Sequence, residues 1–151
     1  MPDYPFGVFE DIESVSNLAL KHGTHCHVDA CLGGFIIGFM GHAGYELPPF
    51  DFRLPGVTTM SCDTHKYACG PKGMSVNMYR FEELREAQFF TTTEWPGGLY
   101  STLTMPGSRS GALIAATWAI MMYHGREVYV EKAKEIVRVT RGLGQKIETL
   151  F

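Results

Sequence analysis

The chain has 151 residues, of which 45% are hydrophobic and 19% charged, and its formal net charge is −3. This composition is typical of a globular chain that can bury a core, and it excludes a disordered or collagen-like chain. The small negative charge, without a dense cluster of Lys and Arg, argues against nucleic-acid binding. Because its apolar runs are well short of the roughly 20 residues that span a bilayer, we expect no transmembrane segment.

The four cysteines do not form the pattern of a disulfide framework or a metal site. Their spacing contains no C-x-x-C pair and no secretory signal precedes them, which favours reduced thiols in an intracellular protein. Cys26 and Cys31 lie near His25 and His27, but their spacing does not match that of a structural zinc site. We therefore expect no metal.

The first half of the chain reads as a helix, a strand, a second helix and a second strand. Residues 10–22 carry apolar side chains at helical spacing and are followed by Gly23, which predicts an amphipathic helix. An extended run at 26–30 precedes a Gly-rich apolar segment at 33–44 and a loop. A β-branched run at 57–62 forms the next strand. Because the crossover is longer than a dozen residues, the two strands are predicted to be parallel and to end at the same edge of the sheet.

The second half of the chain predicts one antiparallel strand followed by helices. Only a loop separates the second strand from a run at 74–79, so this third strand is expected to run antiparallel. A short helix or turn at 81–90 and a loop at 91–105 come next. A strongly apolar helix at 112–123 and an amphipathic helix from 126 to 151 complete the chain.

Ionisable side chains collect where the two parallel strands end. Asp63, His65 and Lys66 stand in the loop SCDTHKYACGPKG at 61–73. An amine that loses hydration there has a lowered pKa and can attack an aldehyde, although a lone Lys after a strand is more often a solvated loop residue. The first strand ends near Asp29, a carboxylate of the kind that keeps the ring nitrogen of pyridoxal phosphate protonated. Ligands bind beyond the carboxyl ends of strands in such sheets, so Lys66 and Asp29 are predicted to meet.

The segment GSRSG at 107–111 directly precedes the apolar helix. Ser108 or Ser110 is expected to cap this helix, and the helix start with Arg109 beside it is suited to an anion. The alternative is a capped helix with a solvated Arg. This segment is not the nucleophile elbow of serine hydrolases because its third position is Arg, and residues 70–75 lack the spacing of a P-loop.

Four segments in register together resemble one enzyme family. They are HVDACLGGF at 27–35, DTHKY at 63–67, PKG at 71–73 and GSRSG at 107–111. The chain resembles the sphingosine-1-phosphate lyase family of pyridoxal phosphate enzymes, which is similar to the glutamate and aromatic amino-acid decarboxylases. The resemblance implies an α/β fold that is part of the large domain of a fold type I pyridoxal phosphate-dependent transferase. Such a domain has a mostly parallel sheet with one antiparallel strand, here over about residues 1–110, and long helices after it, here over 111–151.

The resemblance also implies a cofactor, pyridoxal 5'-phosphate, and a reaction. The expected reaction is retro-aldol cleavage of a phosphorylated sphingoid base to a fatty aldehyde and phosphoethanolamine. The residues that it assigns to the cofactor are Asp29, Ala30, His65 and the catalytic Schiff-base lysine, Lys66. Candidates for substrate binding are Lys72, whose point charge suits a phosphate, together with Ser108 and Arg109.

The chain departs from this family in one residue and in length. Cys69 stands where such lyases typically carry an aromatic residue near the cofactor. In the family, the glycine-rich phosphate cup and the ring-stacking residue precede the region matched here, a C-terminal domain follows it, and the subunit forms a homodimer. We therefore expect a fragment that binds the cofactor weakly or not at all by itself. The full-length protein is expected at the endoplasmic reticulum membrane if it is a eukaryotic lyase with its membrane anchor, and otherwise in the cytoplasm.

Two alternatives to a lyase segment remain open. One is a segment of an amino-acid α-decarboxylase, which would release carbon dioxide from its substrate. The other is a non-catalytic chain that keeps the fold but not the chemistry.

Overall fold

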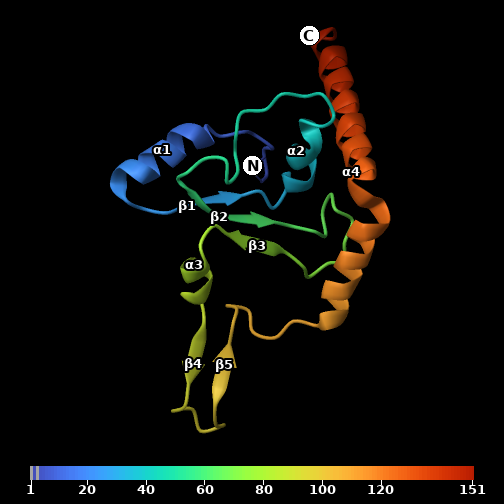
Figure 1. The fold of residues 1–151 in the computed structure, drawn as a ribbon. Coiled ribbons are helices and arrows are strands. Elements are labelled where there is room, and N and C mark those ends of the chain that lie inside the picture. Colours follow the sequence, from blue (N-terminus) through green and yellow to red (C-terminus); the bar gives the residue numbers. More distant parts are fainter. Residues whose placement is uncertain (1, 3) are drawn as a thin grey trace.

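A three-stranded mixed sheet lies at the centre of the structure (Figure 1). The structure is a computed structural model and describes residue 2 and residues 4–151. Its elements in chain order are α1 (Ile12–His22), β1 (Cys26–Asp29), α2 (Gly34–Met40), β2 (Val57–Cys62), β3 (Val76–Tyr79), α3 (Glu82–Glu86), β4 (Phe90–Thr92), β5 (Tyr100–Thr102) and α4 (Gly111–Glu148). This arrangement confirms the predicted α/β fold.

The central sheet, in the order β1-β2-β3, contains one parallel and one antiparallel pair of strands. β1 and β2 run parallel, with Asp29 beside Ser61. β2 and β3 run antiparallel, with Thr59 beside Tyr79. Both pairings agree with the directions predicted from the lengths of the connections. Since β1 and β2 run the same way, their carboxyl ends lie at one edge of the sheet.

The core lies between the sheet, α1, α2 and the loop that precedes β2. Its buried hydrophobic residues are Ala19, Cys26, Val28, Ala30, Ile37, Phe50, Leu54, Val57 and Met60. Along β1 the side chains alternate between buried and exposed, as strand geometry requires. Val28 therefore points into the core, whereas His27 and Asp29 face the other side of the sheet.

The first helix, α1, is fixed at both ends and along its buried side. Asp11 caps it by accepting a hydrogen bond from the Ser14 N–H at 3.0 Å, and Gly23 ends it in the left-handed conformation. Ser16 is fully buried, and its hydroxyl oxygen accepts the N–H of Gly56 at 3.0 Å. A Cβ at Gly56 would lie 2.2 Å from the Ser16 carbonyl oxygen, so this close approach of α1 to the start of β2 requires glycine.

A β-hairpin occupies part of the segment at 91–105, which the sequence predicted as a loop. β4 and β5 pair antiparallel, with Phe90 opposite Thr102. Trp95 packs edge-on against Tyr100 across the turn, with ring centroids 6.1 Å apart. The aromatic and β-branched residues on both sides of the turn favour strands. The loop prediction was therefore wrong at these positions, because it relied on the turn residues Trp-Pro-Gly-Gly and not on the strand-forming residues on both sides of them.

The last helix, α4, is broken at Gly125. This residue adopts φ 62° and ψ 175°, a region of backbone conformation that is essentially restricted to glycine. The break separates the two helical segments that the sequence predicted. At the start of α4, the Ser110 hydroxyl accepts the N–H of Ala112 at 3.3 Å. Of the two predicted capping residues, Ser110 is the cap and Ser108 is not.

Aromatic contacts attach α4 to the rest of the molecule. Tyr129 is buried, and its ring lies 5.5 Å from that of Phe35 and 5.2 Å from that of Phe39, both on α2. Its hydroxyl donates a hydrogen bond to the carbonyl oxygen of Ala68 at 3.0 Å. Tyr129 thus links α4 both to α2 and to the loop that carries Lys66.

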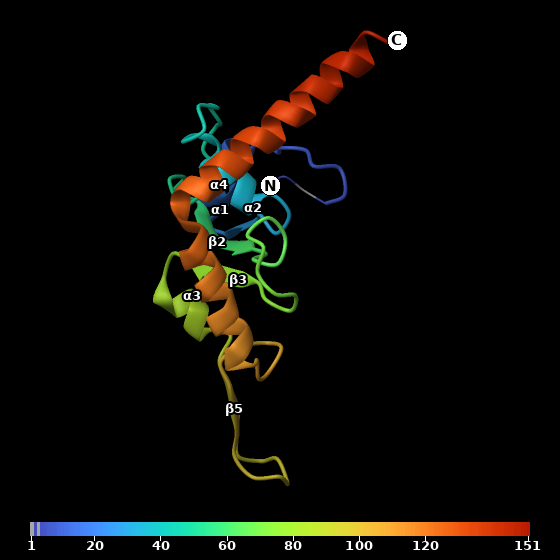
Figure 2. The ribbon, with the colours of Figure 1, turned by 90° about the vertical axis from the view of Figure 1, so that its right-hand side faces the viewer.

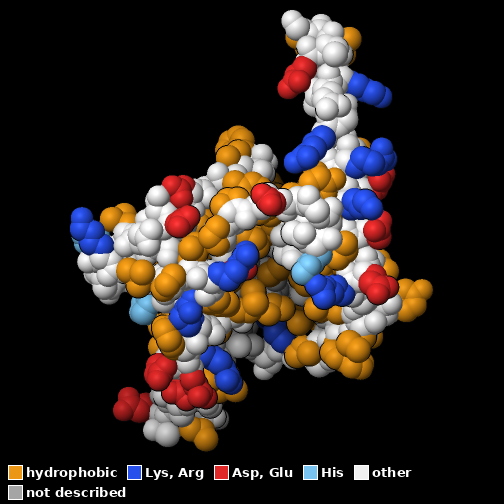
Figure 3. All heavy atoms as spheres, turned by 45° about the horizontal axis from the view of Figure 1, so that its top comes forward, with side chains coloured by type: hydrophobic (Ala, Val, Ile, Leu, Met, Phe, Trp, Pro, Cys, Tyr) orange, Lys and Arg blue, Asp and Glu red, His pale blue; other side chains and the backbone are white. Residues whose placement is uncertain are grey.

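Two parts of the chain project from this body in opposite directions. The β4–β5 hairpin extends at one end and the C-terminal part of α4 at the other (Figure 1, Figure 2). Hydrophobic side chains cover much of the visible face of the body, whereas charged side chains line the projecting part of α4 (Figure 3). Within the described residues, the helices are too short or too polar to cross a bilayer.

Candidate functional site

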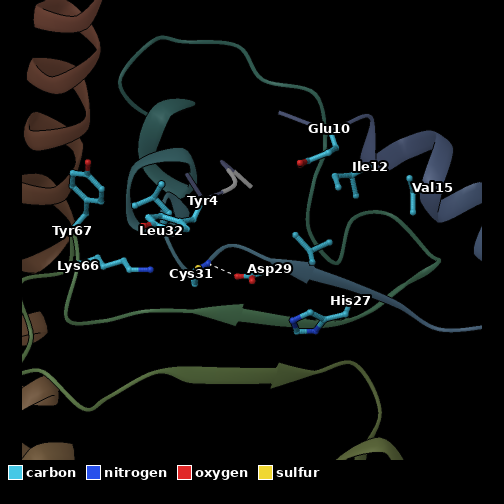
Figure 4. Close-up of a pocket in the computed structure, with 11 residues that line it drawn as sticks. Tyr4, Glu10, Ile12, Val15, His27, Asp29, Cys31, Leu32, Lys66 and Tyr67 are labelled. Carbon is cyan, nitrogen blue, oxygen red and sulfur yellow. Dashed lines mark hydrogen bonds between the residues drawn. The ribbon is translucent and has the colours of Figure 1, made fainter. Parts of the chain in front are cut away.

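A cavity of about 1040 Å³ opens beside β1 and is lined by residues from both faces of this strand (Figure 4). The end of β1, the turn after it, the loop after β2, the N-terminal segment and α1 all contribute to its wall. Its lining residues are Tyr4, Glu10, Ile12, Val15, His27, Val28, Asp29, Cys31, Leu32, Lys66 and Tyr67. The cavity therefore combines an amine, carboxylates and an imidazole with aromatic and aliphatic side chains.

Lys66 and Asp29 line this one cavity, although 37 positions separate them in the sequence. Asp29 is the last residue of β1, and Lys66 follows β2 by four positions. The parallel pairing brings these two strand ends together. The Lys66 side chain extends towards Cys31, which lies between it and Asp29 (Figure 4).

The Asp29 carboxylate is stabilised in its ionised form. Its Oδ1 accepts hydrogen bonds from the Cys31 backbone N–H at 2.9 Å and from the Ser61 hydroxyl at 3.2 Å. Burial by itself would raise the pKa of Asp29, but these hydrogen bonds outweigh it and lower the pKa below the usual value. A negative charge is therefore maintained at this end of β1.

His27 and two hydroxyl groups of β2 extend the polar network around Asp29. The Nδ1 of His27 lies 2.8 Å from Thr59 Oγ1, and its Nε2 lies 3.2 Å from Ser61 Oγ. The sequence analysis did not identify these three residues as part of the site. The signal was present, because polar residues alternate at 27, 29, 59 and 61 of two strands predicted to be parallel neighbours.

Lys66 forms an ion pair that changes the expected state of its amine. Its Nζ lies 2.9 Å from Asp63 Oδ2, and the Asp63 side chain is only 15% exposed. The hydrogen bond that Lys66 donates to Asp63 raises the pKa of Lys66, outweighing the partial burial that would lower it. The lowered pKa expected from the sequence is therefore wrong for this conformation. Asp63, which the sequence analysis gave no role, is the cause.

Ala30 does not line the cavity, although the sequence analysis assigned it to the cofactor. Its side chain is 1% exposed and belongs to the hydrophobic core. The Ala30 side chain packs in the core with that of Val28, but unlike Val28 it does not reach the cavity lining. Cys31, two positions after Asp29, lines the cavity instead.

His65 and Arg109 line a second cavity, of about 700 Å³, and not the one that holds Lys66. The Nδ1 of His65 lies 2.8 Å from the carbonyl oxygen of Met74, so this nitrogen carries the proton. Arg109 donates from Nη1 to the carbonyl oxygens of Pro106 and Ser108 at 3.3 and 3.4 Å. Arg85 contributes a further cation to this cavity.

Lys72 and Ser108 are both exposed and lie outside the linings of these two cavities. The structure thus brings Lys66 and Asp29 together but does not bring the candidate substrate-binding residues to them. In the part of the chain that the structure describes, no three His, Cys, Asp or Glu side chains cluster in a way that would hold a metal ion.

The pyridoxal-dependent decarboxylase conserved domain matches residues 5–150 of the chain. Sphingosine-1-phosphate lyase 1 of Rattus norvegicus is 49% identical over 150 residues, which are 99% of this chain and 26% of the relative. Sphingosine-1-phosphate lyase of Saccharomyces cerevisiae is 50% identical over 137 residues, which are 90% of this chain and 23% of the relative. The chain thus spans about a quarter of the length of these curated relatives.

The chain is also similar to solved structures of a sphingosine-1-phosphate lyase and a decarboxylase. The sphingosine-1-phosphate lyase Bpss2021 of Burkholderia pseudomallei K96243 has a TM-score of 0.80 and 48% identity, covering 87% of this chain and 30% of the lyase. Glutamate decarboxylase of Lactobacillus brevis shares the fold, with a TM-score of 0.75 and 23% identity, over 96% of this chain and 33% of that enzyme. These similarities confirm the predicted resemblance and the predicted fold class. The chain belongs to the pyridoxal-dependent decarboxylase domain family.

Proposed function

We propose that the full-length protein containing this chain is a pyridoxal phosphate-dependent carbon–carbon lyase that acts on a phosphorylated sphingoid base. The observation that carries the proposal is the meeting of Lys66 and Asp29 in one cavity. The high identity to proteins named sphingosine-1-phosphate lyase supports the substrate class. Residues 1–151 would then form part of the cofactor-binding large domain, with 111–151 leading away from it, in a protein that works as a homodimer.

The residues of the cavity suit pyridoxal phosphate. Lys66 offers a primary amine, which condenses with an aldehyde once it has lost its proton. Asp29 offers a carboxylate that is held ionised, as a protonated ring nitrogen requires. When bound, the cofactor supplies an electron sink for the carbanion left by bond cleavage.

The residues of this chain would prepare the site in three ways. Asp63 holds the Lys66 amine in its charged form, so this ion pair must open before the amine becomes a nucleophile. Asp29 would supply a fixed negative charge for the ring nitrogen of the cofactor. Leu32 and Tyr67 give part of the cavity wall an apolar surface that would contact the cofactor.

The second cavity is suited to a phosphate group. His65, Arg85 and Arg109 line it, and guanidinium groups bind phosphate through paired hydrogen bonds. We propose His65 as a contact of the cofactor and Arg109 as a contact of the substrate, with Ser108 and Lys72 nearby in the assembled protein. These four assignments rest on the family resemblance and, for Arg109 and Lys72, also on charge.

The test is to assay the full-length protein with a phosphorylated sphingoid base and to measure fatty aldehyde and phosphoethanolamine. Lys66→Ala should abolish product formation, whereas Lys134→Ala, which changes an exposed lysine of α4, should not. Release of carbon dioxide from an amino acid, without aldehyde from the lipid, would favour the decarboxylase. Absence of both activities in protein that binds the cofactor would contradict the proposal.

A further inference from the structure

We propose that His27 and Ser61 are positioning residues that hold the Asp29 carboxylate in a fixed orientation within the cavity. The proposal rests on the proposed function, because it gives Asp29 the role of binding the cofactor's ring nitrogen. Neither residue is needed for the core, since both lie on the exposed face of the sheet. His27 hydrogen-bonds to Ser61, and Ser61 hydrogen-bonds to Asp29.

The register of the parallel strands aligns the four side chains of this network. His27 lies beside Thr59, and Asp29 lies beside Ser61. His27 contacts Thr59 Oγ1 at 2.8 Å and Ser61 Oγ at 3.2 Å, and Ser61 Oγ contacts Asp29 Oδ1 at 3.2 Å. The hydrogen bonds therefore run continuously from Thr59 through His27 and Ser61 to Asp29.

The chemistry of these groups fixes the direction of the hydrogen bonds. An ionised Asp29 only accepts, so the single proton of the Ser61 hydroxyl must point at Asp29 Oδ1. Ser61 Oγ then accepts from His27, which places a proton on His27 Nε2. In a neutral imidazole the Nδ1 is then an acceptor, and Thr59 donates to it. Thr59 thus donates to His27, His27 donates to Ser61, and Ser61 donates to the Asp29 carboxylate.

The Asp29 carboxylate is restrained by one backbone donor and one side-chain donor. The Cys31 N–H and the Ser61 hydroxyl both donate to Oδ1, and together they set the rotation of the carboxylate. His27 in turn donates to Ser61 Oγ, and this second hydrogen bond helps to hold the hydroxyl proton directed at Asp29. Ser61 lies outside the cavity lining, so it orients the carboxylate without touching a ligand in the cavity, whereas His27 also lines the cavity wall.

Other titratable groups line the cavity with Asp29. Lys66 and Cys31 come from the loops at the strand ends, with burial raising the pKa of the Cys31 thiol, and Glu10 comes from the segment before α1. A change at Asp29 must therefore be separated from changes in these groups. Substitutions at His27 and Ser61 do so, because the hydrogen bonds of these two residues run within the network described above.

The test uses the full-length protein with Ser61→Ala and His27→Leu. The dissociation constant of pyridoxal phosphate is measured from pH 5 to 8 by cofactor absorbance. Both variants should bind about tenfold more weakly, and the loss of affinity at acid pH should begin at a higher pH. Ser61→Thr, which keeps the hydroxyl, should restore binding. His25→Leu, which changes a neighbouring exposed histidine, should bind as the unmodified protein does.

A second measurement on the same proteins does not need the cofactor. The lowered pKa of Asp29 contributes stability that is present above the carboxyl's unfolded pKa and is lost as the pH falls through the folded pKa. Ser61→Ala should therefore cost more unfolding free energy at pH 6 than at pH 3. A purely structural role of Ser61 would give the same cost at both.

The two measurements separate the possible failures. If the unmodified protein binds no cofactor but the pH-dependent cost is seen, the proposed function fails and the hydrogen-bond network stands. If the unmodified protein binds the cofactor and both variants match it in affinity and in the pH dependence of stability, the positioning role is overturned while the proposed function stands.

Discussion

The two halves of the chain differ in how many of their side chains are buried in a shared core. Up to β3, the helices and strands enclose a shared core, and Ser16 and Gly56 join elements 40 positions apart. From α3 onwards, the residues of α3, β4 and β5 are all at least partly exposed, and α4 buries Thr117, Tyr129 and Ala133. The first region thus specifies its conformation by its own packing, whereas the second region depends mainly on local helix and hairpin formation.

The largest effect is expected from a methyl group added at the closest contact in the first region. Gly56→Ala places a Cβ 2.2 Å from the Ser16 carbonyl oxygen, so α1 must move and the protein should lose about 3 kcal/mol. Gly142→Ala in α4 meets no atom within 4 Å and should stabilise the helix by up to about 1 kcal/mol. Urea unfolding of the two variants measures both values. Equal losses would contradict the difference between the regions.

A smaller loss is expected from trimming a side chain of the core. Val57 is fully buried, so Val57→Ala should destabilise the protein by about 2 kcal/mol through lost burial and the cavity left behind. The matched substitution Val139→Ala affects a residue that is 52% exposed and should change stability by less than about 0.5 kcal/mol. Thermal unfolding followed by circular dichroism compares the pair. A large loss at Val139 would show that α4 packs as tightly as the sheet.

Tyr129 tests the connection between the two regions. Tyr129→Phe keeps the ring between α2 and α4 but removes the hydrogen bond to Ala68, which should cost about 1 kcal/mol. Hydrogen exchange of the loop around Lys66 should increase in this variant. Tyr123→Phe, at a residue that is 83% exposed, is the control and should leave both measurements unchanged.

The smallest expected effect is a shift in the pKa of Lys66, without a change elsewhere in the structure. Asp63→Asn removes the main cause of the raised pKa of Lys66, so the amine should lose its proton at a lower pH. Trapping the reaction of Lys66 with pyridoxal phosphate by borohydride at a series of pH values measures this shift. Asp51→Asn, which breaks the pair with Arg53, serves as the control. An unchanged pH profile in Asp63→Asn would mean that the ion pair does not control the amine.

Local patterns and connection lengths were sufficient to predict most of the first region. The spacing of apolar residues predicted α1, and the long crossover predicted the parallel pairing that brings Asp29 and Lys66 together. The short connection after β2 predicted the antiparallel β3. These features follow from chain geometry, so one sequence is enough to derive them.

Apart from the β4–β5 hairpin, the misses concern side-chain partners, which sequence order does not specify. The pKa of Lys66 depends on the rotamer that brings Asp63 to 2.9 Å from its amine. The roles of His27 and Ser61 depend on cross-strand register, which is set only when the strands pair. Ala30 was assigned to the cofactor, but its side chain is buried in the core. These three misses therefore concern the packing between elements and not the elements themselves.

The break at Gly125 divides α4 into two arms with independent helical phase. In an unbroken helix, one inserted residue turns everything beyond it by about 100°. At Gly125 the chain leaves the helical conformation, so the two arms do not share one continuous helical phase. The direction in which Tyr129 points therefore does not follow from the position of Thr117 by helix geometry alone, and the conformation of the glycine sets the relation between them.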